Sequence, residues 1–249
     1  MSLQKDLDFR TLAEAFYLQT LDQLSRANLD EPSLLPDWSR KHVAVHMMHN
    51  AEGFMRLLHW ARTGEKTPMY PSRDARDQAI EDDVKHLENG DVITMSHEVA
   101  DELAHDLGLL PQDRWETQVV SGRGATIPAS DIPWLRAREC FIHALDLNIG
   151  MTALDFPAEV TDRLLTDVTS TWEDRGEPVN YLLHFTDTGE DLHMCTSEDT
   201  QQVQVTGHKA EVLQHLLGRG WPVSGRDDNA KGGAGDSTPR DLPAPPQWL

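Results

Sequence analysis

The segment from Ile132 to Gly150, IPWLRARECFIHALDLNIG, constrains the fold more than any other part of the chain. On a helix, which turns about 100° per residue, its ionisable side chains Glu139, His143 and Asp146 lie within about 60° of one another. They share this face with the apolar residues Ile132, Leu135, Ile142 and Ile149. A buried carboxylate is unfavourable unless it is paired or bound to a cation. The segment therefore predicts a helix whose core-facing side holds a cation.

A histidine on a second amphipathic segment completes a ligand set. His46 lies three residues after Val43 and four before Asn50, on the apolar side of a predicted helix. Glu139 and His143, four residues apart, project together from the other helix. Two imidazoles and one carboxylate, with a fourth position left open, are typical of catalytic zinc sites. The pattern predicts a metalloenzyme whose ligands are His46, Glu139 and His143.

Other polar residues near these ligands leave alternatives open. His42 and His46 are also four apart and His49 follows, so HxxxHxxH is a competing metal pattern that does not need Glu139. His42 and His49 fall on the flanks of the apolar stripe, and we expect them to face solvent. Asp146 is expected either to orient His143 or a nearby cation, or to form a structural ion pair.

Helical and alternating patterns divide the chain into two domains. Apolar spacing predicts helices in the first part and a short hairpin over them, and alternation predicts strands in the second part. Ser39 is expected to cap the second helix, and Ser130 or Asp131 the fourth. The fold class is therefore α+β, with a four-helix bundle at 1–152 and a small α/β domain with a C-terminal tail at 153–249. The predicted elements are helices at 6–26, 39–62, 74–105 (broken near Asn89-Gly90), 132–150, 157–175 and 208–220, a hairpin at 118–130, and strands at 180–187, 192–197 and 201–207.

Charge and cysteine content exclude several partners. Lys+Arg 22 against Asp+Glu 42 gives a net charge of -20, which argues against binding to nucleic acid or to an anionic membrane. Two cysteines, Cys140 and Cys195, are too few for a disulfide framework and suit a reducing compartment. Both are expected to be small packed residues rather than nucleophiles. With no apolar leader and no long apolar run, we expect a cytoplasmic protein.

Arg219 is the candidate for substrate binding. It lies at the end of the last predicted helix, in LLGRG. The simpler interpretation is a cation that interacts with the helix dipole. The functional interpretation is a clamp for a carboxylate, which the planar guanidinium suits.

At these residues the chain resembles the mycothiol-dependent maleylpyruvate isomerases, a family of DinB-like metal-binding bundles with a small C-terminal domain. The resemblance extends from about Leu34 to Leu249 and so includes both domains. Two departures are His49, where an aromatic residue is expected, and a longer polar insert, RDDNAKGGAGDSTPRD. The segments that carry the resemblance are HVAVHMMHNA, LLHWARTGEKTPMY with ARDQAIE, GRGATIPAS, WLRARECFIHALDL, LLGRG and PPQWL.

The resemblance implies a function and roles for these residues. The metal ligands fall on His46, Glu139 and His143, and the substrate arginine falls on Arg219. The implied reaction, which follows gentisate ring opening, is the isomerisation of maleylpyruvate to fumarylpyruvate. A thiolate of mycothiol, activated by Zn²⁺ or another divalent metal, would add to the double bond, allow rotation and leave. The implied partners are a dicarboxylate substrate and a low-molecular-weight thiol, and a monomer is expected.

Two other functions remain open at this stage. The same scaffold can support an S-transferase that conjugates mycothiol, or another thiol, to electrophiles. A non-catalytic metal-binding bundle is the third possibility, but it leaves Arg219 without a role.

Overall fold

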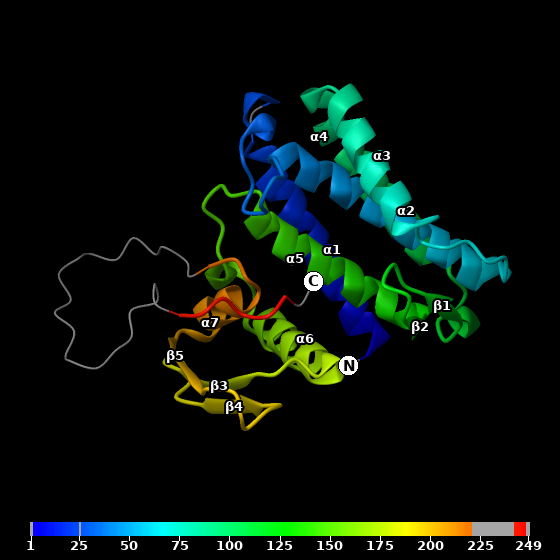
Figure 1. Ribbon diagram of the computed structural model, residues 1–249. Coiled ribbons are helices and arrows are strands. Elements are labelled where there is room, and N and C mark those ends of the chain that lie inside the picture. The colour runs from blue at the N-terminus through cyan, green and yellow to red at the C-terminus, as the bar shows by residue number, and fades with distance from the viewer. Residues whose placement is uncertain (1, 25, 221–241, 248–249) are drawn as a thin grey trace. The chain divides into compact units, whose positions relative to one another are not determined.

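The computed structural model describes residues 2–24, 26–220 and 242–247 (Figure 1). The chain divides into two units, Met1–Gly150 and Met151–Leu249. The first unit is helical with one small hairpin, and the second combines helices with a three-stranded sheet. The predicted α+β class is therefore confirmed. The polar insert at 226–241 lies outside the described residues.

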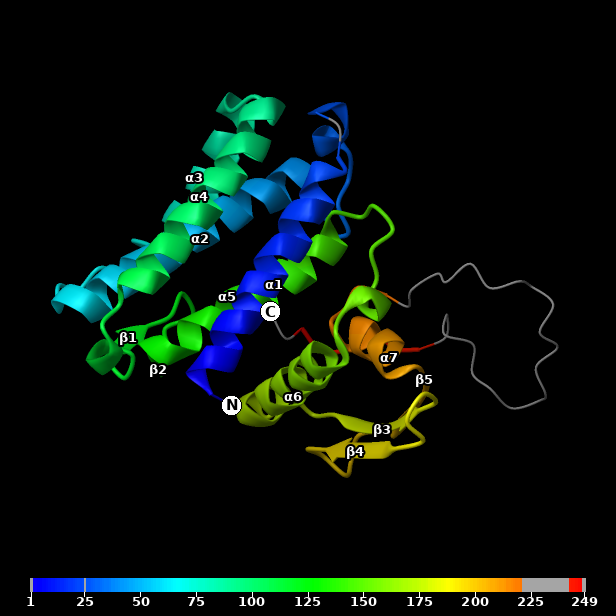
Figure 2. The same cartoon turned by 180° about the vertical axis from the view of Figure 1, so that it is seen from behind.

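In the described residues of the first unit, four long helices form a bundle (Figures 1 and 2). α1 packs against α5, and α2 packs against α4; α2 also contacts α5, and α1 contacts α4. α3 packs on α2. The helices are α1 (Leu3–Asp22), α2 (Arg40–Thr63), α3 (Arg73–His86), α4 (Asn89–Leu109) and α5 (Ile132–Asp146), with 3-10 turns at Arg26–Asp30, Gln112–Arg114 and Ala129–Asp131.

Helix α2 begins and ends close to the predicted residues. The hydroxyl of Ser39 accepts a hydrogen bond from the amide of His42, which satisfies one of the free amides of the first turn. Gly64 follows the helix with φ of 79°, a left-handed conformation that glycine adopts without strain. The predicted third helix is two helices, α3 and α4, and they separate at Leu87 and Glu88.

Helix α5 differs from the prediction at both ends. In the part of the chain that the structure describes, α5 lacks the side-chain cap expected from Ser130 or Asp131, and Pro133 lies in its first turn instead. The helix ends at Asp146 rather than near Gly150. Asn148 and Gly150 have φ of 54° and 96°, so the backbone leaves the helical conformation there.

The hairpin of β1 (Gln118–Val120) and β2 (Thr126–Pro128) is antiparallel, with Val119 opposite Ile127. A Cβ atom on Gly122 would lie 3.2 Å from Cε2 of Tyr70. Glycine at this position therefore lets the hairpin approach the connection between α2 and α3, where Tyr70 lies.

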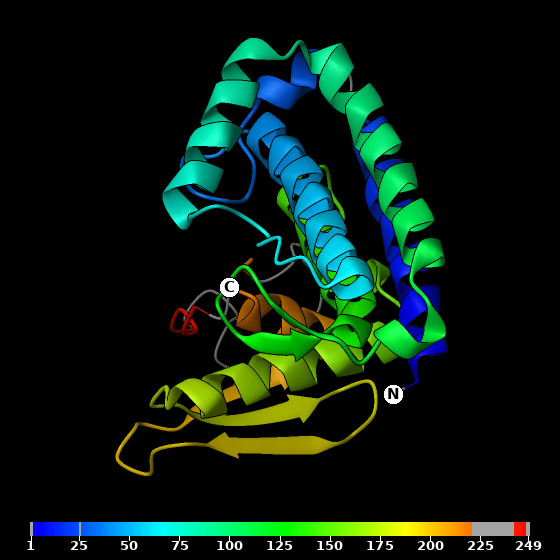
Figure 3. The same cartoon turned by 90° about the vertical axis from the view of Figure 1, so that its right-hand side faces the viewer.

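The second unit packs two helices on one face of a sheet (Figure 3). The strand order is β4-β3-β5, in which β3 pairs antiparallel with β4 and parallel with β5. The ring of Trp172 in α6 stacks on Tyr181 of β3, with 5.8 Å between centroids. Its elements are a 3-10 turn (Ala153–Asp155), α6 (Ala158–Arg175), β3 (Asn180–Phe185), β4 (Asp191–Cys195), β5 (Val203–Gly207) and α7 (Lys209–Leu216). Among the described residues, no helix is both long and apolar enough to cross a membrane.

Candidate metal centre

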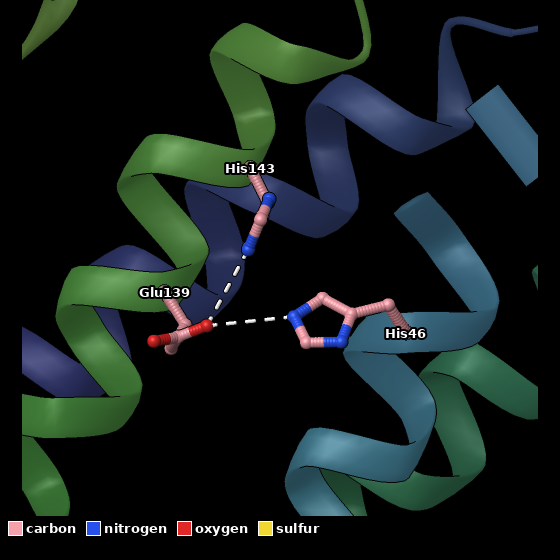
Figure 4. Close-up of side chains that lie close together, drawn as sticks. All are labelled: His46, Glu139 and His143. Atoms are coloured by element: carbon pink, nitrogen blue, oxygen red, sulfur yellow. Dashed lines mark ion pairs between the residues drawn. The ribbon is translucent and has the colours of Figure 1, made fainter. Parts of the chain in front are cut away.

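Two helices bring three potential metal ligands together inside the bundle (Figure 4). His46 projects from α2, and Glu139 and His143 project from successive turns of α5. Both imidazoles are buried, and the Glu139 side chain is 14% exposed. One ligand atom from each residue lies within 4.8 Å of the other two. The structure therefore places the three predicted ligands side by side.

The separations fit metal coordination better than hydrogen bonding. Oε2 of Glu139 lies 3.5 Å from Nε2 of His46 and 3.4 Å from Nε2 of His143. A hydrogen bond between nitrogen and oxygen is usually about 2.7–3.2 Å long. Two atoms that are each about 2.1 Å from a tetrahedral zinc ion lie about 3.4 Å apart. The donor set therefore fits a divalent cation with one coordination position left open.

Asp146 contacts the imidazole of His143 at Nδ1, whereas Glu139 lies on the Nε2 side. The Oδ2 atom of Asp146 lies 2.9 Å from Nδ1 of His143, and the aspartate is fully buried. Burial alone would lower the pKa of His143, but the hydrogen bond to Asp146 and the nearby carboxylate of Glu139 outweigh it and raise the pKa to about 9. With a cation bound, the proton would stay on Nδ1, where it forms the hydrogen bond to Asp146, and the lone pair of Nε2 would be free to coordinate the cation.

His46 is also buried and packs against two aromatic rings. Its ring centroid lies 5.6 Å from that of Trp38 and 4.8 Å from that of His143. Burial, partly offset by Glu139, lowers the pKa of His46 to about 4. Its Nδ1 atom is buried and has no hydrogen-bond partner among the described residues. The imidazole is therefore neutral near pH 7, which is the form that binds metals.

Glu139 supplies the negative charge of the centre. Burial would raise its pKa, but the interactions with His143 and His46 lower it well below its usual value.

Tyr70 lies close enough to Glu139 to be affected by its charge. Burial, reinforced by the charge of Glu139, raises the pKa of Tyr70 to about 12. The guanidinium of Arg76 lies 5.8 Å from the centre of the Tyr70 ring. Sequence reasoning did not select Tyr70, because no periodicity marks a loop residue, and it did not select Arg76 of α3 either, although both lie in segments that carry the family resemblance.

The competing histidines contact α3 rather than the three ligands. Nε2 of His42 lies 3.7 Å from Glu81, and its Nδ1 is bonded to Ser39. Nε2 of His49 lies 2.8 Å from Asp83. Both rings are half-buried, so they are less exposed than predicted, because α3 covers this flank of α2.

The remaining candidates are not members of this donor set. Cys140 is buried, and burial raises the pKa of its thiol well above the usual value, so it stays protonated. Cys195 is an exposed free thiol on β4 of the second unit, so the prediction that it is packed is wrong; it ends an edge strand of the sheet. Arg219 follows α7 in the second unit, where its Nη1 donates to the carbonyl oxygen of Leu217 at 2.8 Å. This contact is of the helix-end type, and the carboxylate clamp remains a prediction.

Comparison with known proteins gives matches over the whole chain. Residues 10–148 match the model of the mycothiol maleylpyruvate isomerase N-terminal domain. A crystal structure of the mycothiol-dependent maleylpyruvate isomerase aligns with 28% identity and a TM-score of 0.86, covering 100% of this chain and 98% of that one. A histidine-to-alanine mutant of that enzyme aligns with 28% identity, a TM-score of 0.85 and the same coverage. No curated protein matches the chain.

Proposed function

This chain belongs to the mycothiol maleylpyruvate isomerase family, and from that premise we propose that it converts maleylpyruvate to fumarylpyruvate with mycothiol as the thiol cofactor. The observation that carries the proposal is the convergence of His46, Glu139 and His143, with nitrogen-to-oxygen separations of 3.5 and 3.4 Å. The alignment with the solved isomerase over 100% of this chain also supports it, because that enzyme shares both units.

The proposed metal is Zn²⁺ or another divalent cation held by these three side chains. A cation in this position would lower the pKa of a thiol at the open coordination position, so that the thiol ionises near neutral pH. The chain contributes the orientation of the ligands. Asp146 fixes the ring of His143, and burial keeps His46 neutral.

The proposed reaction needs a temporary loss of double-bond character. The cis alkene of maleylpyruvate accepts the sulfur of the thiolate, and its π electrons move into the conjugated carbonyl. The former double bond can then rotate. When the electrons return, the carbon–sulfur bond breaks, the trans alkene forms and the thiol is regenerated. The proposed role of Arg219 is to bind a substrate carboxylate and to stabilise the negative charge of the adduct.

The proposed setting is the cytoplasm, in the step after gentisate ring opening. The free thiols of Cys140 and Cys195 fit a reducing compartment. We also propose that the protein acts as a monomer, since a single chain supplies all three ligands.

The direct test is an assay of the zinc-loaded protein with maleylpyruvate, with and without mycothiol. Proton NMR should show conversion of the cis to the trans alkene only when the thiol is present, and the free thiol should be fully recovered at the end. Recovery matters because an S-transferase would consume one thiol for each substrate molecule. Consumption of thiol without the trans product would contradict isomerisation and favour S-transfer.

Two sets of variants test which side chains bind the metal and whether the nucleophilic sulfur comes from an external thiol. We expect His46→Ala to lose bound zinc and nearly all activity, whereas the matched variant His49→Ala, one turn further along α2, keeps its zinc.

Cys140→Ser and Cys195→Ser should keep most of the thiol-dependent activity, because the nucleophile is external. Activity that persists without added thiol and disappears in Cys140→Ser would overturn the external-thiol mechanism.

A further inference from the structure

Arg136 of α5 ties together three helices of the bundle from a position one turn before Glu139. It is only 1% exposed. Its Nη1 atom donates to the carbonyl oxygen of Met47 at 2.9 Å and to Oδ1 of Asn50 at 2.8 Å, both on α2. Its Nη2 and Nε atoms donate to the carboxylate of Glu14 on α1, at 2.7 and 3.1 Å. One side chain of α5 is thus bonded to specific atoms of α2.

Arg40 of α2 makes the reciprocal connection at the other end of α5. Its Nε atom donates to the carbonyl oxygen of Leu147, and its Nη2 atom to that of Asn148, each at 2.7 Å. These carbonyls lie at the C-terminal end of α5, where a cation is favourable. Its Nη1 atom donates to Glu31 and to the carbonyl oxygen of Asn28, and both of these residues lie outside the two helices.

The three metal ligands lie between these two arginine cross-links, defined as the bonds of Arg40 and of Arg136 that join α2 to α5. Along α2 the order is Arg40, His46, Asn50. Along α5 their partners follow in the opposite order: Leu147 and Asn148, then His143 and Glu139, then Arg136. At a rise of about 1.5 Å per residue, His46 is about 9 Å from Arg40 and about 6 Å from Asn50 along α2.

Stability alone is a weak reason for such cross-links. Burying a guanidinium is costly, and well-packed apolar residues often hold two helices together equally well. Hydrogen bonds to specific carbonyl and amide oxygens, however, fix the register of one helix against the other, which apolar contacts do less strictly. A metal site requires such control, since its ligand distances must be correct to about 0.2 Å.

We propose that Arg40 and Arg136 are positioning residues that hold α2 and α5 in the register at which His46 meets Glu139 and His143, so that the site is formed before the cation binds. This inference rests on the metal site of the proposed function. It assigns a role to two arginines whose hydrogen bonds, as described above, do not go to any of the three ligand side chains.

The test compares variants that lose bonds between α2 and α5 with a variant in which Arg40 loses only a bond to another segment. Arg40→Met removes the cross-link to Leu147 and Asn148, and Asn50→Ala removes part of the cross-link from Arg136. Glu31→Gln is the matched control, because it removes the ion pair of Arg40 but leaves its bonds to α5. Each purified metal-free protein is titrated with Zn²⁺ against a chromophoric chelator and with Co²⁺ by visible absorption. Its fold is checked by circular dichroism and thermal unfolding.

We expect Arg40→Met and Asn50→Ala to fold but to bind Zn²⁺ at least about tenfold more weakly, with an altered Co²⁺ spectrum, since contacts that support ligands commonly contribute this much. Glu31→Gln should bind within about twofold of the wild type, since the Glu31 carboxylate is half exposed and its ion pair with Arg40 therefore contributes little. Should Arg40→Met fail to fold, Arg40→Lys gives the same test, because an ammonium keeps the charge without the planar fork that holds both carbonyls.

Two results overturn the inference, and they are distinguishable. If folded Arg40→Met and Asn50→Ala bind Zn²⁺ with wild-type affinity and an unchanged Co²⁺ spectrum, while His46→Ala loses the metal, the positioning role is wrong and the metal site stands. If His46→Ala keeps wild-type affinity, the metal site itself is wrong, and the inference is overturned with it.

Discussion

The carboxylate of Asp146 is fully buried, and its contact with His143 compensates for the cost of burial. A chemically similar pair lies on the surface of the second unit, where Nδ1 of His184 is 2.6 Å from Asp191 and both side chains are exposed. Water competes for such an exposed pair, which therefore contributes little. Substitutions in the two pairs therefore show whether an aspartate–histidine contact contributes more when it is buried.

Replacing Asp146 with asparagine should weaken metal binding without removing any ligand. The side-chain amide would keep an oxygen near Nδ1 of His143 but lose the negative charge that makes the imidazole a better donor. We expect zinc affinity to fall by about 10–100-fold, measured by chelator competition. Asp191→Asn, at the exposed pair, should have no measurable effect. Equal zinc affinity in Asp146→Asn and the wild type would show that Asp146 is only a structural partner.

At the scale of secondary-structure elements, periodicity predicted the helices and their inward faces. It placed His46, Glu139 and His143 on core-facing stripes, because a helical pattern reports which residues share a side. It did not predict the partner of Arg136, since Glu14 lies 122 positions away in sequence and on another helix. The predicted cap of α5 is correct only in position: Asp131 is the N-cap residue, but it lies in a 3-10 turn with a helical backbone conformation, and its side chain makes no capping hydrogen bond.

Helix α2 contains a glycine whose role is packing rather than flexibility. A Cβ atom on Gly53 would lie 2.6 Å from Cγ of the buried Met69. We expect Gly53→Ala to lower the free energy of unfolding, because an overpacking cost of about 1–3 kcal/mol outweighs the gain in helix propensity of about 1 kcal/mol.

The matched control is Gly108→Ala in α4, where a Cβ atom would meet nothing within 4 Å. This change should be neutral or stabilising by up to about 1 kcal/mol. Urea denaturation of both variants measures the two free energies of unfolding. A stabilised Gly53→Ala would contradict close packing between α2 and Met69.

At the scale of the whole molecule, the proposed function needs residues from both units. The three ligands belong to the first unit, and Arg219 belongs to the second. A net charge of -20 repels a dianionic substrate, so a local cation is needed to bind its carboxylates. The comparison supports a two-unit enzyme, because the solved isomerase aligns over 98% of its own length.

Arg219 is the residue whose substitution tests this requirement. Arg219→Lys keeps the charge but loses the planar fork, so its kcat/KM should fall, and Arg219→Ala should be more impaired. Loss of a charge-assisted pair in a closed site costs about 2–5 kcal/mol, or more than tenfold in rate. Steady-state kinetics with maleylpyruvate and mycothiol measure the loss, and zinc content should not change in either variant.

Arg175→Ala separates a specific clamp from a change in net charge. Arg175 also ends a helix of the second unit, and its Nη1 atom donates to the carbonyl oxygen of Gln247. Its removal changes the charge of the protein by the same amount as Arg219→Ala. We expect Arg175→Ala to keep wild-type kcat/KM while Arg219→Ala does not. If Arg219→Ala also keeps wild-type kcat/KM, Arg219 is only a helix-end cation, and the first unit must recognise the substrate alone; an equal loss in both variants would instead indicate an effect of net charge.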